Sequence, residues 1–133
     1  MNNILVLKGT YYGINYDFSM QTQCTIISGD SGTGKTLMFN ILREHEASNH
    51  SILALNMKKS FDRDFNNALT DVNTLIVLDR LDYWAEEEDI SHIEEAIHAC
   101  DNRFILISRH YCFMLPSTAR KRLVFKNNIL QFE

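Results

Sequence analysis

Short apolar runs alternate with segments of helical periodicity along most of the chain. Four runs have the length and composition of strands buried on both faces: Cys24–Ser28, Ile52–Leu55, Thr74–Asp79 and Phe104–Ile107. Three segments between them have apolar residues at helical spacing: Leu37–Glu46, Phe61–Leu69 and Ile90–Cys100. This alternation predicts an α/β fold in three layers, with helices on both faces of a mostly parallel sheet.

The two ends of the chain follow a different pattern. A strand-like run at Ile4–Leu7, followed by glycines, predicts an antiparallel hairpin or meander at one edge of the sheet. Near the other end, Leu123–Phe125 and Ile129–Phe132 flank an Asn127-Asn128 pair that suits a tight turn, so a second edge hairpin is expected. The polar segment before it contains Arg120-Lys121-Arg122. We interpret this tripeptide as a solvated basic turn, with an arginine finger for a neighbouring subunit as the alternative.

Two other features have alternative explanations. The aromatic cluster Tyr11, Tyr12 and Tyr16 is explained by edge-strand packing, although it also suits the face of an adenine ring. The acidic run at 86–89 is explained as the solvated start of a helix, where the dipole favours negative charge, rather than as a metal site. Ser91 and Glu94 have the spacing of a capping box for that helix.

Length and composition narrow the class of protein. The 133 residues predict a single domain spanning 1–133, and 45% apolar content is typical of globular proteins. A net charge of −4 gives no clear nucleic-acid footprint. No stretch of about 18 apolar residues indicates membrane insertion. Three widely spaced cysteines favour neither a disulfide scaffold nor zinc, so we expect a cytoplasmic protein.

The most specific motif is Gly29-Asp30-Ser31-Gly32-Thr33-Gly34-Lys35-Thr36, which satisfies the phosphate-binding pattern G-x-x-x-x-G-K-[ST]. A predicted strand precedes it and a predicted helix follows it. In that context the loop N–H groups and the helix N-terminus bind phosphate oxygens. Lys35 is expected to reach the β- and γ-phosphates, and the Thr36 hydroxyl is expected to bind Mg²⁺.

Polar residues also follow two other predicted strands. Asp79 is suited to the magnesium side of the site, because hard cations prefer oxygen ligands. Arg80 stands where many nucleotide hydrolases have a glutamate, so Asp82 is the nearest candidate to position or deprotonate water; a turn-stabilising Asp82 is the alternative. Ser108 is a second candidate to hold that water, and Arg109 is expected to contact the γ-phosphate. His110 is expected to be a surface residue.

In this order, GDSGTGKT, TLIVLDRLD and FILISRH resemble the Walker A, Walker B and sensor strands of the P-loop NTPase superfamily. The polar residue that ends the strand after Walker B is similar to the additional-strand (ASCE) branch, and the Asp79, Asp82 and Arg109 pattern looks most like its STAND and AAA-like domains. The 108–110 segment also resembles ABC proteins, but no L-S-G-G-Q signature is present. The branch implies strand order 5-1-4-3-2, with the sensor strand between Walker A and Walker B.

These features predict a Mg-ATP-binding protein that is a weak or partner-dependent ATPase. ATP rather than GTP follows from the branch and from the missing N-K-x-D motif. Its expected partners are a second copy of the chain or an unidentified protein. A nucleotide-gated binding module without hydrolysis is one alternative, motivated by Arg80, and a small-molecule kinase is another.

Overall fold

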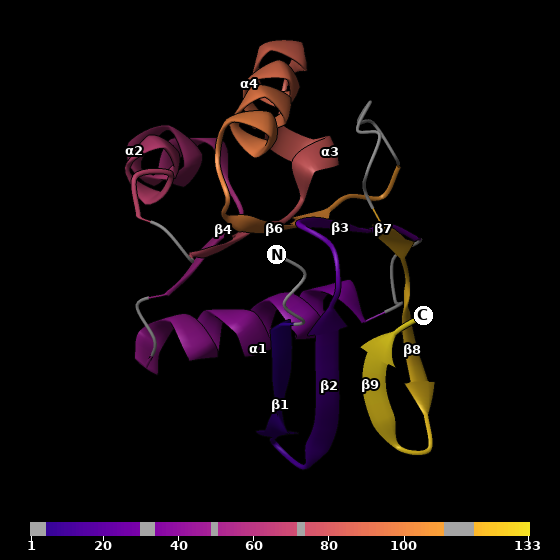
Figure 1. The fold of residues 1–133 in the computed structure, drawn as a ribbon. Helices are drawn as coiled ribbons and strands as arrows, with labels where there is room; N and C mark the ends of the chain where they lie inside the picture. Colours follow the sequence, from indigo (N-terminus) through magenta and orange to yellow (C-terminus); the bar gives the residue numbers. More distant parts are fainter. Residues whose placement is uncertain (1–4, 30–33, 49–50, 72–73, 111–118) are drawn as a thin grey trace.

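The structure is a computed structural model that describes residues 5–29, 34–48, 51–71, 74–110 and 119–133. Within these ranges the chain forms two β-sheets and four helices (Figure 1). The helices are α1 (Lys35–Ser48), α2 (Lys58–Ala68), α3 (Leu81–Trp84) and α4 (Glu87–Ala99). None of these four described helices has the length and apolar character that crossing a membrane requires.

The larger sheet has five strands, all parallel. In spatial order they are β4 (Ile52–Leu55), β5 (Leu75–Leu78), β6 (Arg103–Ile107), β3 (Cys24–Ile27) and β7 (Ala119–Lys121). If β3, β4, β5, β6 and β7 are numbered 1 to 5, this spatial order is 2-3-4-1-5. Listed from the opposite edge of the sheet, it is the expected order 5-1-4-3-2. The α/β class and the parallel sheet are therefore confirmed, and β6 lies between β3 and β5.

The edge strand β7 was not predicted, because its residues are polar and we expected a solvated turn there. Arg120 and Lys121 instead pair through their backbone with Ile26 and Ile27 of β3. An edge strand bonds to a neighbour on one side only and leaves polar side chains in water, so it lacks the apolar run of a central strand.

The smaller sheet contains both predicted hairpins. Its strands, in spatial order, are β1 (Leu5–Tyr11), β2 (Ile14–Met20), β9 (Ile129–Phe132) and β8 (Leu123–Lys126). The two hairpins are antiparallel as expected, and Asn127 and Asn128 have φ of 55° and 63°, as the tight turn requires. Their predicted place at the edges of the parallel sheet is wrong, because β2 pairs in parallel with β9 and forms a separate sheet.

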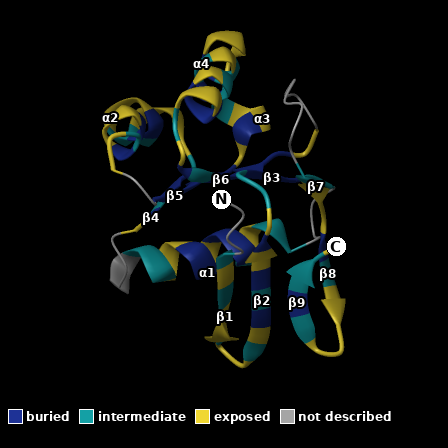
Figure 2. Ribbon diagram, viewed as in Figure 1, coloured by how far each residue is buried: buried dark blue, intermediate teal, exposed yellow. Residues whose placement is uncertain are grey.

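Two hydrophobic cores explain this arrangement (Figure 2). Val77 of β5 faces a core shared with α1 and the smaller sheet, where Phe18 and Leu42 are fully buried. Leu78, the next residue, faces the core under α2, α3 and α4. The smaller sheet thus covers the side of α1 that the parallel sheet leaves exposed, and it adds a layer to the predicted three.

Tyr16 belongs to the first core. It is 7% exposed, its ring stacks on Phe18 at 5.2 Å, and its hydroxyl lies 2.5 Å from Nε2 of His45 on α1. Packing is therefore the correct explanation for Tyr16, and an adenine face is wrong for this residue.

The acidic run at 86–89 starts α4, as expected, but with a different cap. Glu86 accepts a hydrogen bond from the backbone of Asp89, and the Asp89 carboxylate accepts one from the Glu86 N–H at 3.0 Å. The predicted capping box at Ser91 and Glu94 is wrong, because the helix already begins at Glu87. Asp89 is buried and also pairs with Lys58 at the start of α2, at 2.5 Å.

Candidate functional site

The register of the parallel sheet brings three predicted segments to one edge. Ile27 at the end of β3 pairs with Ile107 at the end of β6, and Leu78 at the end of β5 pairs with Leu106. The residues that follow these strands therefore leave the sheet side by side. This edge is where open α/β sheets bind ligands.

A pocket of about 110 Å³ opens at this edge. Six residues singled out in the sequence line it: Lys35, Thr36, Asp79, Asp82, Ser108 and Arg109. Three further lining residues were not predicted as site residues: Arg80, Tyr83 and Ile107. Residues 30–33, which include Asp30, Ser31, Gly32 and Thr33 of the predicted loop, lie outside the described residues. The described candidates thus come from β3–α1, the β5 end and the β6 end, and they meet around one space.

The two described glycines at the ends of the loop have backbone conformations that favour glycine. Gly29 has φ of 137° and Gly34 has φ of 95°. A Cβ on Gly34 would also lie 3.6 Å from Leu130 of β9, so the smaller sheet packs against the loop. Helix α1 begins at Lys35, and the Met38 N–H donates to the Gly34 carbonyl at 2.9 Å.

Lys35 bends back onto the loop. Its Nζ donates a hydrogen bond to the carbonyl oxygen of Gly29, at the opposite end of the motif. Lys35 also lines the pocket, together with Thr36 and Asp79. The Thr36 residue is exposed, in the first turn of α1.

Asp79 is the buried acid of the site. It is 6% exposed; its Oδ1 accepts the Arg80 N–H at 2.8 Å, and its carbonyl accepts the Trp84 Nε1–H at 2.8 Å. Burial raises the pKa of the Asp79 carboxyl to about 6, against opposing contributions from Arg80 and Lys35. A cation beside this buried carboxylate would favour its charged form and so oppose the effect of burial.

Asp82 ties two strand ends together. Its Oδ1 accepts the Arg109 N–H at 3.1 Å and the Ser108 hydroxyl at 3.5 Å. Such bonds are of the kind expected for the alternative, a structural Asp82. They join Asp82 to the end of the neighbouring strand β6 and not only to its own turn. Ser108 is 1% exposed, whereas the Arg109 residue is exposed at the mouth of the pocket.

The segment after Asp79 has a conformation that its residues do not predict. Arg80 is left-handed, with φ of 57° and ψ of 37°, and its guanidinium lies 5.1 Å from the centre of the Tyr83 ring. Helix α3 starts directly after it, and Trp84 closes the turn onto Asp79. The sequence contains no glycine or asparagine at position 80 that would have signalled a left-handed residue.

His110 is exposed, as expected, and lines an adjoining cavity rather than the small pocket. Cys24 and Cys100, the two cysteines in the described ranges, are free thiols, and Cys112 lies outside those ranges. Nor do three or more His, Cys, Asp or Glu side chains of the described residues gather around a common metal position. Mg²⁺ needs fewer protein ligands, because it keeps several waters, and the Thr36 hydroxyl and Asp79 carboxylate are the oxygen donors that it prefers.

The pocket combines cationic and anionic groups. Lys35, Arg80 and Arg109 suit phosphate oxygens, whereas Asp79 and Asp82 suit a cation between protein and phosphate. No protein-family model matches the chain, and no curated protein is similar to it.

Proposed function

We propose that the chain is a Mg-ATP-binding domain of the P-loop NTPase superfamily, in the additional-strand branch, and a weak ATPase that depends on self-association or a partner. The observation that carries this proposal is the lining of one pocket by Lys35, Thr36 and Asp79, which the motifs had assigned to phosphate and magnesium. The position of β6 between β3 and β5 supports the branch.

In this proposal Lys35 exchanges its bond to the Gly29 carbonyl for bonds to the β- and γ-phosphate oxygens. Thr36 and Asp79 hold Mg²⁺, which neutralises charge that develops on the phosphates. Arg109 at the pocket mouth pairs with the γ-phosphate, where its planar guanidinium matches two oxygens.

ATP binding is tested by titration calorimetry with Mg-ATP. Lys35→Ala is expected to weaken binding by at least about tenfold, because a charge-assisted hydrogen bond contributes about 1.5–3 kcal/mol. The matched control is Lys59→Ala, at an exposed position in α2, which should leave binding unchanged. Equal affinity in the wild type and both variants would refute the phosphate site. GTP competition tests the base preference, and chelation of Mg²⁺ should weaken binding of ATP.

A second function, a nucleotide-gated module without turnover, is favoured by the bonds of Asp82. Its Oδ1 is engaged by Arg109 and Ser108, which suits a structural role better than that of a general base. If a change at the phosphates moved Arg109, the bond from its N–H to Asp82 would transmit the movement to Asp82 and to helix α3.

Single-turnover measurements with radiolabelled ATP separate the two functions. Phosphate release that Asp82→Asn abolishes without weakening ATP binding supports an ATPase in which Asp82 positions water. Stable retention of intact ATP by the wild type supports the binding module and ends the case for unassisted hydrolysis.

A further inference from the structure

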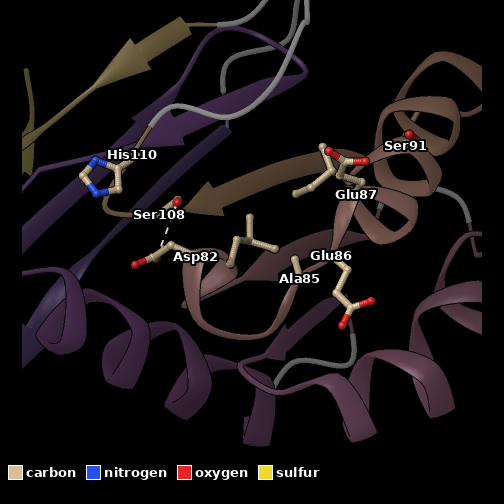
Figure 3. Close-up of a pocket in the computed structure, with 9 residues that line it drawn as sticks. Asp82, Ala85, Glu86, Glu87, Ser91, Ser108 and His110 are labelled. Carbon is tan, nitrogen blue, oxygen red and sulfur yellow. Dashed lines mark hydrogen bonds between the residues drawn. The ribbon is translucent and has the colours of Figure 1, made fainter.

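A second and larger cavity lies beside the pocket. It has a volume of about 580 Å³ and opens between the end of β6, helix α3 and the first turns of α4 (Figure 3). Sites for small molecules are typically about 300–1,000 Å³. The cavity is therefore large enough for a ligand of its own.

The two spaces share a wall. Asp82 and Ser108 line both, and the hydrogen bond between them is drawn in Figure 3. A ligand in the larger cavity would thus lie against the same two side chains as a nucleotide in the smaller one.

The charges on the two sides of this wall are opposite. Lys35, Arg80 and Arg109 line the small pocket. The described residues that line the larger cavity include no lysine or arginine, but three carboxylates: Asp82, Glu86 and Glu87. Such a lining favours a cation over the phosphates that suit the neighbouring pocket.

The three carboxylates are not equivalent. Asp82 accepts the Arg109 N–H, and Glu86 caps α4 by accepting from the Asp89 backbone. Within the described part of the chain, no hydrogen bond or ion pair engages Glu87, which lies on the α4 side of the cavity in Figure 3. Glu87 is thus the acid whose charge is available to a ligand.

Apart from the imidazole of His110, the rest of the lining is apolar or hydroxylic. Leu81 is buried at 1% exposure, and Ala85 and Ile90 are half-buried beside it. Ser91 stands on the same wall as Glu87. An apolar group that covers the three apolar residues is removed from water, and it would leave its charged end near Glu87.

We propose that this cavity binds a small molecule with an ammonium group on an apolar body. The ammonium donates to Glu87, and the apolar body packs on Leu81, Ala85 and Ile90. Binding needs no nucleotide, so this proposal stands independently of the proposed function.

The probe is phenethylamine, which joins a primary ammonium to a single ring. Nuclear magnetic resonance titration of the whole chain should show saturable shifts of the Ala85 and Ser91 amides. The anionic analogue 3-phenylpropionate, with the same ring, should bind at least tenfold more weakly. Equal binding of the two compounds, or no saturable shift with phenethylamine, would overturn the proposal.

Glu87→Gln should weaken phenethylamine binding about fivefold, as expected for loss of one ion pair at a partly open site. The matched control is Glu88→Gln, because the two glutamates are adjacent in the first turn of α4 and Glu88 is outside the cavity lining. Equal loss in both variants would assign the attraction to the net charge of the protein and refute the site.

A further variant tests the space itself. Ser91 is exposed, so Ser91→Phe fills the cavity without removing a buried group and should abolish binding. Retained binding in that variant would place the amine elsewhere. Lys35→Ala should lose ATP and keep phenethylamine, which separates failure of this proposal from failure of the nucleotide site.

Discussion

At the amino end of the parallel sheet, polar side chains bond to backbone carbonyls of neighbouring elements, whereas at the carboxyl end Lys35, Asp79 and Asp82 bond to the backbone and also line an open pocket. Gln23, just before β3, donates through Nε2 to the carbonyls of Ile97, Cys100 and Asn102 at 3.0, 2.7 and 3.1 Å. The bonds to Ile97 and Cys100 satisfy carbonyls at the end of α4, which the helix cannot satisfy itself, and the bond to Asn102 reaches the residue just before β6.

Two other side chains complete the amino end. Asn102 is 2% exposed and donates to the Ala68 carbonyl at the last residue of α2, at 3.2 Å. Arg103 donates to the carbonyls of Met20 and Thr22 at 3.3 and 3.2 Å. The ends of α2, α4 and β2 are thus fastened to the starts of β3 and β6.

At the carboxyl end of the sheet, in contrast, several residues have surroundings or conformations that cost stability. Asp79 is buried at the cost of a raised pKa, Arg80 has a left-handed backbone, and Arg109 is exposed. A left-handed backbone at a residue other than glycine costs about 1–3 kcal/mol, and residues of this kind cluster at active sites and ligand clamps of proteins. The amino end therefore stabilises the fold, whereas the buried acid and the left-handed Arg80 at the carboxyl end cost stability.

The largest expected effect is at the amino end. Gln23→Ala should lower the free energy of unfolding by about 3 kcal/mol, because it leaves several part-buried carbonyls without a donor, at about 1–3 kcal/mol for each one left unsatisfied. Urea denaturation measures this change. Gln21→Ala is the control, since Gln21 is exposed two residues away, and it should change stability by less than about 0.5 kcal/mol. Equal losses in both variants would remove the distinction between the two ends.

The second prediction is that a substitution at the carboxyl end stabilises the protein. The pKa of Asp79 is raised to about 6, so the native state holds this proton more tightly than the unfolded state does. Asp79 therefore costs stability progressively as the pH rises from about 4 to 6, and fully above 6. Free of metal and nucleotide, Asp79→Asn should be more stable than the wild type by about 2 kcal/mol at pH 8 and by almost nothing at pH 4.

Thermal unfolding in a chelating buffer measures this difference. Asp101→Asn is the control, at an exposed acid between α4 and β6, and it should change stability by less than about 0.5 kcal/mol. A destabilised Asp79→Asn at pH 8 would mean that a cationic partner already compensates the carboxylate. Addition of Mg-ATP should reverse the order and stabilise the wild type more than Asp79→Asn.

The buried parts of the fold could be predicted because their patterns are local. Leu75–Leu78 is apolar at every position, and Asn127-Asn128 specifies its own turn. The smaller sheet could not be predicted, since it depends on pairing Asn15–Asp17 with Ile129–Gln131, more than 110 residues later. Polar β7 has no apolar run, because it is an edge strand that pairs with β3 alone among the described strands.

The candidate site divides in the same way. The sequence indicates which residues end the strands, and the structure brings Lys35, Asp79 and Ser108 around one pocket. The sequence does not indicate that Asp82 bonds to the end of β6, because that contact depends on the order of the strands and on helix α3. Nor does an arginine predict the backbone conformation at position 80.

The smallest expected effect comes from two substitutions that test the left-handed backbone of Arg80. Arg80→Ala and Arg80→Gly both remove the contact with Tyr83, but alanine keeps the steric cost of a left-handed backbone, about 1–2 kcal/mol, whereas glycine does not. Glycine also loses more entropy on folding, which offsets part of this advantage. The free energy of unfolding of the Gly variant, measured by urea denaturation, should still be higher than that of the Ala variant by about 1 kcal/mol. Glu95 is exposed within α4 and is the control position. There the order should reverse, and Glu95→Ala should be more stable than Glu95→Gly by about 1 kcal/mol. The same sign at both positions would mean that Arg80 is not strained, and that the carboxyl end differs from the amino end only through Asp79.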